Sequence, residues 1–128
     1  MSDRVKYSSG VIWEDLVGYS RAIKIDNRIL ISGTTSIVDG KIIGEGDPYI
    51  QTKTIIDKLE TVLHQAESKL EDIVRLRVYV TDISGWEEVG RALGETFKKI
   101  KPAQTLVAVS ALVDPKMMVE IEAEAVVS

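Results

Sequence analysis

Residues 73–80 read IVRLRVYV, and this stretch decides what kind of fold the chain can form. Successive side chains of a β-strand point to opposite faces of a sheet, so the two faces can be considered separately. One face is purely aliphatic and comprises Val74, Leu76, Val78 and Val80. The other comprises Ile73, Arg75, Arg77 and Tyr79. The stretch therefore predicts a strand with one side in a core and a polar opposite side.

A helix is predicted on either side of this strand in the sequence. Asp47-Pro48 supplies an N-cap and a proline at the first helical position. Apolar residues then recur at helical spacing, at Ile55, Ile56, Leu59, Val62, Leu63, Ala66 and Leu70. Ser84 and Glu87 form a capping-box pattern before the second helix, and Pro102 ends it. Its apolar residues are Trp86, Val89, Leu93, Phe97 and Ile100.

Further strands are predicted at both ends of the chain. Their ranges are 20–25, 28–34, 105–110 and 117–127. The turn-rich loop 36–46 carries a hairpin signal at Asp39-Gly40. The order is β-β-α-β-α-β-β, which predicts an α+β protein with a mixed sheet and two helices on one face. No repeat or linker interrupts the pattern, so residues 1–128 are expected to form a single domain.

The last predicted strand bears a row of carboxylates. Glu120, Glu122 and Glu124 alternate with apolar residues, so they share one face and lie about 7 Å apart. Burying them unpaired would be costly. Two interpretations stay open at this point. The carboxylates form ion pairs with Arg75 and Arg77, or they line a polar cleft that another subunit closes.

Composition excludes several classes of function. The 128 residues include no cysteine, so a disulfide framework, a thiolate nucleophile and a cysteine zinc site are impossible. The net charge of −4 argues against nucleic acid as the main partner. The apolar runs are too short to span a bilayer, and the first ten residues lack the apolar region of a signal peptide, so a cytoplasmic protein is expected. The glutamates could bind a hard cation, but nearby arginines disfavour a metal site.

Short motifs spread along the chain resemble one family. They are Gly18-Tyr19-Ser20, Ser32-Gly33, Gly46-Asp47, Gln51-Thr52, Tyr79-Val80-Thr81-Asp82, Pro102-Ala103 and Glu120-Ile121-Glu122-Ala123. In this order and at these distances, the chain resembles the Rid (YjgF) family over nearly its whole length. The resemblance implies a chorismate-mutase-like fold and a homotrimer whose sheets form a central barrel. It also implies cofactor-free hydrolysis of reactive imines and enamines, such as 2-iminobutanoate or 2-aminoacrylate, at a site between subunits.

The resemblance also implies roles for particular residues. Tyr19 matches the site tyrosine, and Glu120 matches the glutamate that holds the attacking water, so these two are the expected catalytic residues. Ser32 and Gly33 match residues that line the pocket, and Thr105 matches a serine of the same site.

One position departs from the family pattern. Gln104 stands where the family has its carboxylate-binding arginine, as in subgroups of the family that lack it. A glutamine is neutral, and losing a charge-assisted hydrogen bond costs about 1.5–3 kcal/mol, or about ten- to a hundredfold in binding. Free 2-imino acids are therefore expected to be poor substrates. Arg77 is the residue we expect to replace the missing guanidinium, if any does.

Three functions remain open on the sequence. The first is an imine or enamine hydrolase whose specificity Gln104 has altered. The second is a non-catalytic trimer that binds a small metabolite or protects other proteins. The third is an endoribonuclease, which the negative charge and the single histidine, His64, disfavour. The partners expected are further copies of the chain and a small-molecule ligand, with neither nucleic acid nor membrane.

Overall fold

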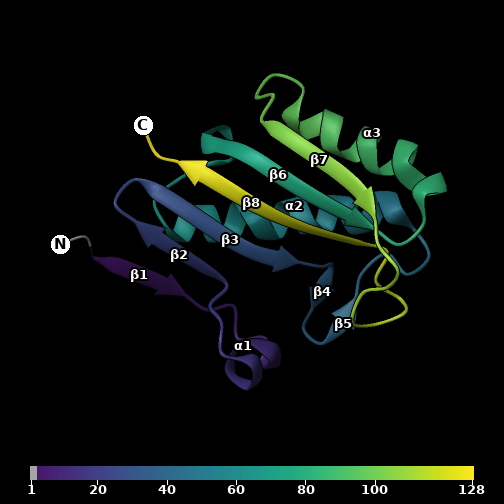
Figure 1. Ribbon diagram of the computed structural model, residues 1–128, viewed down its shortest axis with the longest axis horizontal. Helices are drawn as coiled ribbons and strands as arrows, with labels where there is room; N and C mark the ends of the chain where they lie inside the picture. The colour runs from purple at the N-terminus through teal and green to yellow at the C-terminus, as the bar shows by residue number, and fades with distance from the viewer. Residues whose placement is uncertain (1–2) are drawn as a thin grey trace.

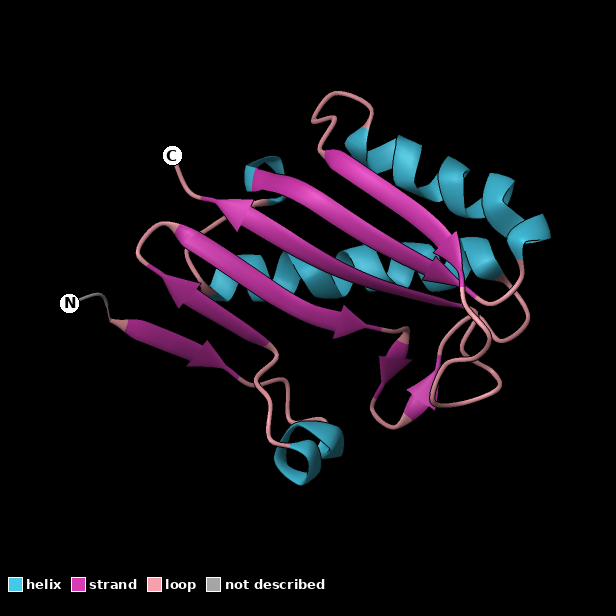
Figure 2. Cartoon of the chain, in the orientation of Figure 1, coloured by secondary structure: helices cyan, strands magenta, loops and turns pink. Residues whose placement is uncertain are grey.

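A six-stranded mixed sheet with two helices on one of its faces forms the body of the chain (Figures 1 and 2). The computed structural model describes residues 3–128. The strands are β1 (Arg4–Tyr7), β2 (Ala22–Ile25), β3 (Arg28–Thr34), β4 (Ile37–Val38), β5 (Lys41–Ile42), β6 (Ile73–Val80), β7 (Ala103–Ala108) and β8 (Val119–Val126). The α-helices are α1 (Ile12–Val17), α2 (Pro48–Gln65) and α3 (Trp86–Phe97). The predicted α+β class is confirmed.

The last strand of the chain lies inside the sheet. The strand order is β1-β2-β3-β8-β6-β7, and β6 with β7 is the parallel pair. The strand β8 is antiparallel to both β3 and β6, so residues near the C-terminus contact both halves of the chain. In Figure 1 the long helices α2 and α3 lie behind the sheet, whereas the short helix α1 lies below it. The face without helices is uncovered and presents Leu30 beside Glu122 and Glu124.

The predicted core forms between the sheet and the two helices. The stripe of α2 is buried at Ile55, Ile56, Leu59, Val62, Leu63 and Ala66. On β8 the buried residues are Val119, Ile121, Ala123 and Ala125, which alternate with the half-buried glutamates as predicted. Each large aliphatic side chain contributes about 1.5–3 kcal/mol when it is fully buried. These contacts hold α2 firmly against β3 and β8.

Two residues of the stretch 73–80, Ile73 and Val74, were assigned to the wrong faces. Val74 is 46% exposed, whereas Ile73 is 2% exposed and joins the core. The pairing of β6 with β8 shifts between Ile73 and Arg75. Such a bulge adds a residue to one strand and reverses the alternation on one side of it. The sequence pattern does not reveal the bulge, since both faces offer an aliphatic residue there.

Of the predicted helix caps and hairpin turns, two are confirmed and one is wrong. The Asp47 side chain accepts a hydrogen bond from the Ile50 N–H at 3.1 Å, which confirms the predicted N-cap. The hairpin at Asp39-Gly40 is also confirmed, and both residues have the positive φ that a tight β-hairpin turn requires. The capping box at Ser84 is wrong, because Ser84 donates to Asp82 and α3 begins without a side-chain cap.

Two elements near the N-terminus were missed. The strand β1 has four residues, too few for its alternation of polar and apolar residues to indicate a strand, and it is almost fully exposed at the sheet edge. The helix α1 has only six residues and no capping side chain. The strand β7 begins two residues earlier than predicted, at Ala103, because it follows the parallel register of β6. None of the helices within residues 3–128 is long and apolar enough to cross a membrane.

Candidate functional site

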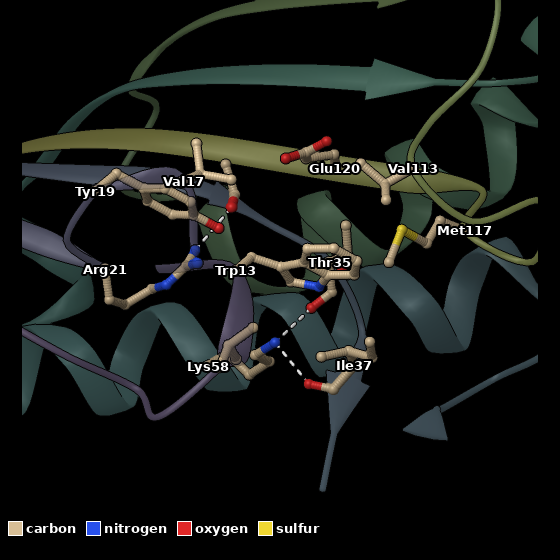
Figure 3. Close-up of a pocket in the computed structure, with 12 residues that line it drawn as sticks. Trp13, Val17, Tyr19, Arg21, Thr35, Ile37, Lys58, Val113, Met117 and Glu120 are labelled. Atoms are coloured by element: carbon tan, nitrogen blue, oxygen red, sulfur yellow. Dashed lines mark hydrogen bonds between the residues drawn. The ribbon is translucent and has the colours of Figure 1, made fainter. Parts of the chain in front are cut away.

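A cavity of about 190 Å³ opens between α1, α2 and the end of β3 (Figure 3). Its walls are mainly apolar and comprise Val11, Trp13, Val17, Ile37, Val113 and Met117. Five polar or charged residues also border it, namely Tyr19, Arg21, Thr35, Lys58 and Glu120. An apolar cavity with a few convergent polar groups is the usual form of a small-molecule site. We refer to this cavity as the Glu120 pocket.

The Glu120 carboxylate lies against the backbone of Gly33. The pairing of β3 with β8 is irregular between Ile31 and Thr34, so Gly33 sits in the bulged part of β3. A Cβ atom at Gly33 would stand 2.2 Å from the Glu120 Oε2, a distance that no real contact allows. Glycine is therefore required for the carboxylate to lie here. Burial raises the pKa of Glu120 above its ordinary value, Arg21 opposes this, and Glu122 adds to it.

Arg21 fixes the shape of the bulge. The residue is 6% exposed, and its guanidinium donates to the Gly33 carbonyl at 2.7 Å and to the Thr34 Oγ1 at 3.0 Å. Its Nε donates to the Glu14 carboxylate at 3.4 Å. The guanidinium also lies over the Tyr19 ring, 5.7 Å from its centre. Arg21 thus connects three parts of the pocket, although sequence reasoning gave it no role.

Glu14 holds α1 beside the pocket. It is 4% exposed and accepts hydrogen bonds from the Ser8 hydroxyl at 2.9 Å and from the N–H and hydroxyl of Ser9. Burial by itself would raise the pKa of Glu14, but hydrogen bonds from Ser9 and Ser8 and the charge of Arg21 outweigh it and lower the pKa. At the end of α1, Gly18 adopts a left-handed φ of 91°, which turns the chain toward Tyr19.

Lys58 borders the pocket from α2. Its ammonium donates to the carbonyls of Thr35 and Ile37, each at 2.7 Å (Figure 3). Within residues 3–128, no carboxylate lies within 4.0 Å of it. Burial first, and then the charge of Arg21, lowers the pKa of Lys58 to about 8, although Glu14 opposes the shift. A signal for Lys58 existed in the sequence, because it lies three residues after Ile55 and four before Val62, on the buried side of the helix.

The predicted site residues divide between two surfaces. The Glu120 pocket brings together Tyr19, Gly33 and Glu120. Ser32 instead borders an adjoining hollow of about 540 Å³ on the sheet face without helices, and its hydroxyl donates to the Ser20 carbonyl at 2.7 Å. Arg77 lies outside the pocket lining and pairs with Glu122 at 3.4 Å and Glu124 at 3.3 Å. The interpretation that the glutamates pair with an arginine therefore holds for Glu122 and Glu124 with Arg77, whereas Glu120 forms no ion pair with residues 3–128.

Gln104 and Thr105 lie on β7, away from the Glu120 pocket. Gln104 is exposed at the sheet edge and pairs in register with Leu76. It borders a different hollow, beside Gly94, Phe97 and Lys101. The strand β6 separates β7 from β8, so their backbones are about 10 Å apart. One chain alone does not bring Gln104 and Glu120 together.

The polar groups of the pocket do not form a metal site. No group of three or more His, Asp or Glu side chains within residues 3–128 has the arrangement to hold a metal ion. Arg21 and Lys58 are cations that would repel one. The arrangement suits an uncharged or anionic small molecule, with Glu120 as proton acceptor and Lys58 as donor or nucleophile.

One family model and several related sequences match most of the chain. The family model described as Endoribonuclease L-PSP matches residues 13–127. The Uncharacterized protein SCO2049 of Streptomyces coelicolor is 32% identical over 120 residues, which cover 94% of this chain and 90% of that protein. The RutC family protein PYRAB12510 of Pyrococcus abyssi is 36% identical over 108 residues, which cover 82% of this chain and 83% of that protein.

Solved structures agree with the sequence relatives. Rv2704 of Mycobacterium tuberculosis, described as a member of the YjgF/YER057c/UK114 family, is 43% identical with a TM-score of 0.89, over 98% of this chain and all of that one. YyfA of Yersinia pestis, described as belonging to the Rid protein family, is 28% identical with a TM-score of 0.85, again over 98% of this chain and all of that one. The family model covers residues 13–127, the sequence relatives and solved structures agree with it, and the chain belongs to the Rid (YjgF) family.

Proposed function

We propose that this protein hydrolyses small imines or enamines to carbonyl compounds and ammonia in the Glu120 pocket. The observation that carries the proposal is the Glu120 carboxylate, which faces an apolar cavity beside a glycine that leaves it room. Glu120 accepts no hydrogen bond from residues 3–128, so its oxygens are available to a water molecule or ligand. Its raised pKa makes it a stronger proton acceptor than a solvated carboxylate.

The proposed reaction uses Glu120 twice. A water molecule bound to Glu120 attacks the imine carbon, the carboxylate takes one proton from the water, and the C=N electron pair moves to nitrogen. Glu120 then returns the proton to that nitrogen. Glu120 next carries the proton of the new hydroxyl group to the same nitrogen, the C–N bond breaks, ammonia leaves, and the carbonyl forms. General acid–base catalysis of this kind contributes about 10²–10⁴-fold to the rate. Tyr19, at the rim of the cavity, is proposed to donate a hydrogen bond to the substrate.

We also propose that another copy of the chain completes the site. Gln104 and Thr105 lie at the opposite sheet edge from β1, so they can approach a Glu120 pocket only from a second subunit. The β7 edge is exposed and includes the apolar Val107, which is 42% exposed. Unprotected edges of this kind are suited to packing against another chain. The homotrimer expected from the family resemblance would supply this contact.

The test is ammonia release from imines generated in solution. The panel contains 2-iminobutanoate, 2-aminoacrylate and imines without a carboxylate. We expect Glu120→Gln to lower turnover about 10²–10⁴-fold. The matched control Glu122→Gln, two residues along the same strand, should keep its activity because Glu122 lies outside the pocket. No turnover on any member of the panel, or full activity in Glu120→Gln, would contradict the proposal.

A further variant tests specificity. Gln104→Arg should improve turnover of carboxylate-bearing imines by about ten- to a hundredfold relative to uncharged ones. The expected gain rests on contact between Gln104 and a pocket of a neighbouring subunit. An unchanged ratio would place Gln104 outside the substrate site.

A second candidate is a non-catalytic metabolite-binding trimer, which the neutral Gln104 favours. In that case the wild type would show no turnover, but small metabolites would raise its melting temperature. Ribonuclease activity that survives rigorous purification and disappears in Glu120→Gln would instead support the description of the family model.

A further inference from the structure

Lys58 is the charged group of the pocket that the water mechanism leaves unused. Arg21 is occupied by Glu14 and by the backbone of the bulge. Among residues 3–128, the hydrogen-bond partners of Lys58 are neutral, namely the carbonyls of Thr35 and Ile37, each at 2.7 Å. Figure 3 shows its amine within the set of side chains that line the cavity, with Glu120 on the other side. The Lys58 side chain is thus held by two carbonyls, and no carboxylate of residues 3–128 forms an ion pair with it.

The two carbonyl partners leave the lone pair of the neutral Lys58 amine available. A neutral amine has two N–H groups and one lone pair. The carbonyls of Thr35 and Ile37 accept both N–H groups, so the lone pair is left without a protein partner. Lysines that act as nucleophiles toward carbonyl compounds are desolvated or placed next to another cation. Lys58 meets both conditions, because it is half-buried and Arg21 lies on the same cavity.

We propose that Lys58 is a nucleophilic amine that forms a covalent imine with small carbonyl or imine compounds bound in the Glu120 pocket. With a protonated imine substrate, the Lys58 lone pair forms a bond to the imine carbon, and the C=N electron pair moves to the substrate nitrogen. A proton passes from the Lys58 nitrogen to the substrate nitrogen. Ammonia then leaves as its C–N bond breaks, and Lys58 is left as a protonated imine. Water adds to that carbon, and the carbonyl product departs with Lys58 restored as an ammonium.

The surroundings support this chemistry. The lowered pKa of about 8 gives Lys58 a neutral fraction of about one quarter at pH 7.5, roughly 200-fold more than an ordinary lysine has. The charged groups around the pocket are Arg21 from the start of β2, Glu14 from α1 and Glu120 from β8. Arg21 disfavours the ammonium form, and Glu120 can accept the proton that leaves when the amine attacks.

The inference adds a covalent step to the proposed hydrolysis and rests on that function only for its natural substrate. The bond itself can be tested with stable carbonyl compounds. The probes are 2-oxobutanoate, which is anionic, and butanone, which is neutral. Wild-type protein is incubated with each probe at pH 7.5, reduced with borohydride, digested, and analysed by mass spectrometry. We expect one adduct per chain, on the peptide that contains Lys58, with a yield that rises with pH and levels off above about pH 8.

Two variants serve as controls. Lys58→Arg keeps the charge and can still donate to the Thr35 and Ile37 carbonyls, but a guanidinium does not form the imine. It should lose the adduct and retain its melting temperature. Lys53→Met changes a lysine of the same helix that pairs with Glu95 outside the pocket, and should keep the adduct at Lys58.

The outcomes separate this inference from the proposed function. If exposed lysines such as Lys53 react as much as Lys58, general reactivity explains the adducts and the inference is wrong. If wild type hydrolyses imines but gives no adduct at Lys58, the inference is overturned and direct attack by water stands. If the adduct forms at Lys58 without any imine turnover, the nucleophile is established and the hydrolase proposal fails.

Discussion

Glu120 and Glu122 lie two residues apart on the same strand, yet their surroundings differ. Glu122 accepts hydrogen bonds from the Tyr79 hydroxyl and from Arg77, and belongs to an ion-paired cluster on the open sheet face. Glu120 has no hydrogen-bond donor among residues 3–128 and faces a cavity. A carboxylate that is satisfied by its neighbours stabilises a surface. One that is half-buried without a donor is available to a ligand, so the difference separates the candidate site from the structural cluster.

The largest expected effect concerns the buried pair behind Glu120. Glu14→Gln removes the countercharge of Arg21, and breaking a buried ion pair in this way costs about 3 kcal/mol or more. Urea unfolding at pH 7 measures the loss. The control Glu95→Gln changes an exposed pair on α2 and α3 and should have a much smaller effect. Equal losses of unfolding free energy in the two variants would show that the buried Glu14–Arg21 pair stabilises the protein no more than the exposed pair of Glu95 does.

Gly33→Ala tests the close approach of Glu120 to the bulge. A Cβ atom 2.2 Å from the Glu120 Oε2 forces the carboxylate to move, and a misplacement of about 1 Å can lower turnover about 10²-fold. The imine assay measures this, while the melting temperature should change little because a carboxylate end can swing away. The control Gly94→Ala lies in α3 with open space around it and should add about 0.5–1 kcal/mol of stability. Full turnover in Gly33→Ala would contradict the assignment of Glu120, rather than Glu122, to the candidate site.

The pH dependence of stability gives a smaller but diagnostic effect. The folded-state pKa of Glu120 is raised, so its contribution to stability is fully present below its unfolded pKa and is lost as pH rises through the folded pKa. Glu120→Gln should therefore unfold at higher urea than wild type at pH 7. This advantage should shrink as pH falls toward the unfolded value near 4.5. A constant difference between pH 4.5 and pH 7 would mean that burial does not destabilise the charged form.

Arg77→Met is expected to have the smallest effect. It removes the cation shared by Glu122 and Glu124, whose side chains are all partly exposed, so the free energy of unfolding should fall by about 1 kcal/mol or less. Because exposed pairs are screened, the loss should diminish in high salt. Imine turnover should be unaffected, since Arg77 lies outside the Glu120 pocket. A large loss of turnover would favour the prediction that Arg77 binds the substrate.

Much of the fold could be predicted because its signals are local. The strand at residues 73–80 and the helix after Asp47 have alternating or helical apolar patterns, and these form as predicted at Ile73–Val80 and Pro48–Gln65. The three glutamates of β8 share a face for the same reason. The elements that were not predicted, β1 and α1, are short and mostly exposed, so their sequences contain no extended pattern of buried apolar residues.

The sequence by itself determined the family, the α+β class and the placement of Tyr19, Gly33 and Glu120 in one pocket. It also identified Gln104 as a departure from the family pattern. Tertiary structure alone decided that Arg77 is taken by Glu122 and Glu124, and that Arg21 and Lys58 are the cations of the pocket. The reason is physical. Periodicity records which side of an element is buried, but a cavity depends on the bulge in β3 and on how α1 and α2 approach it, which no single element encodes.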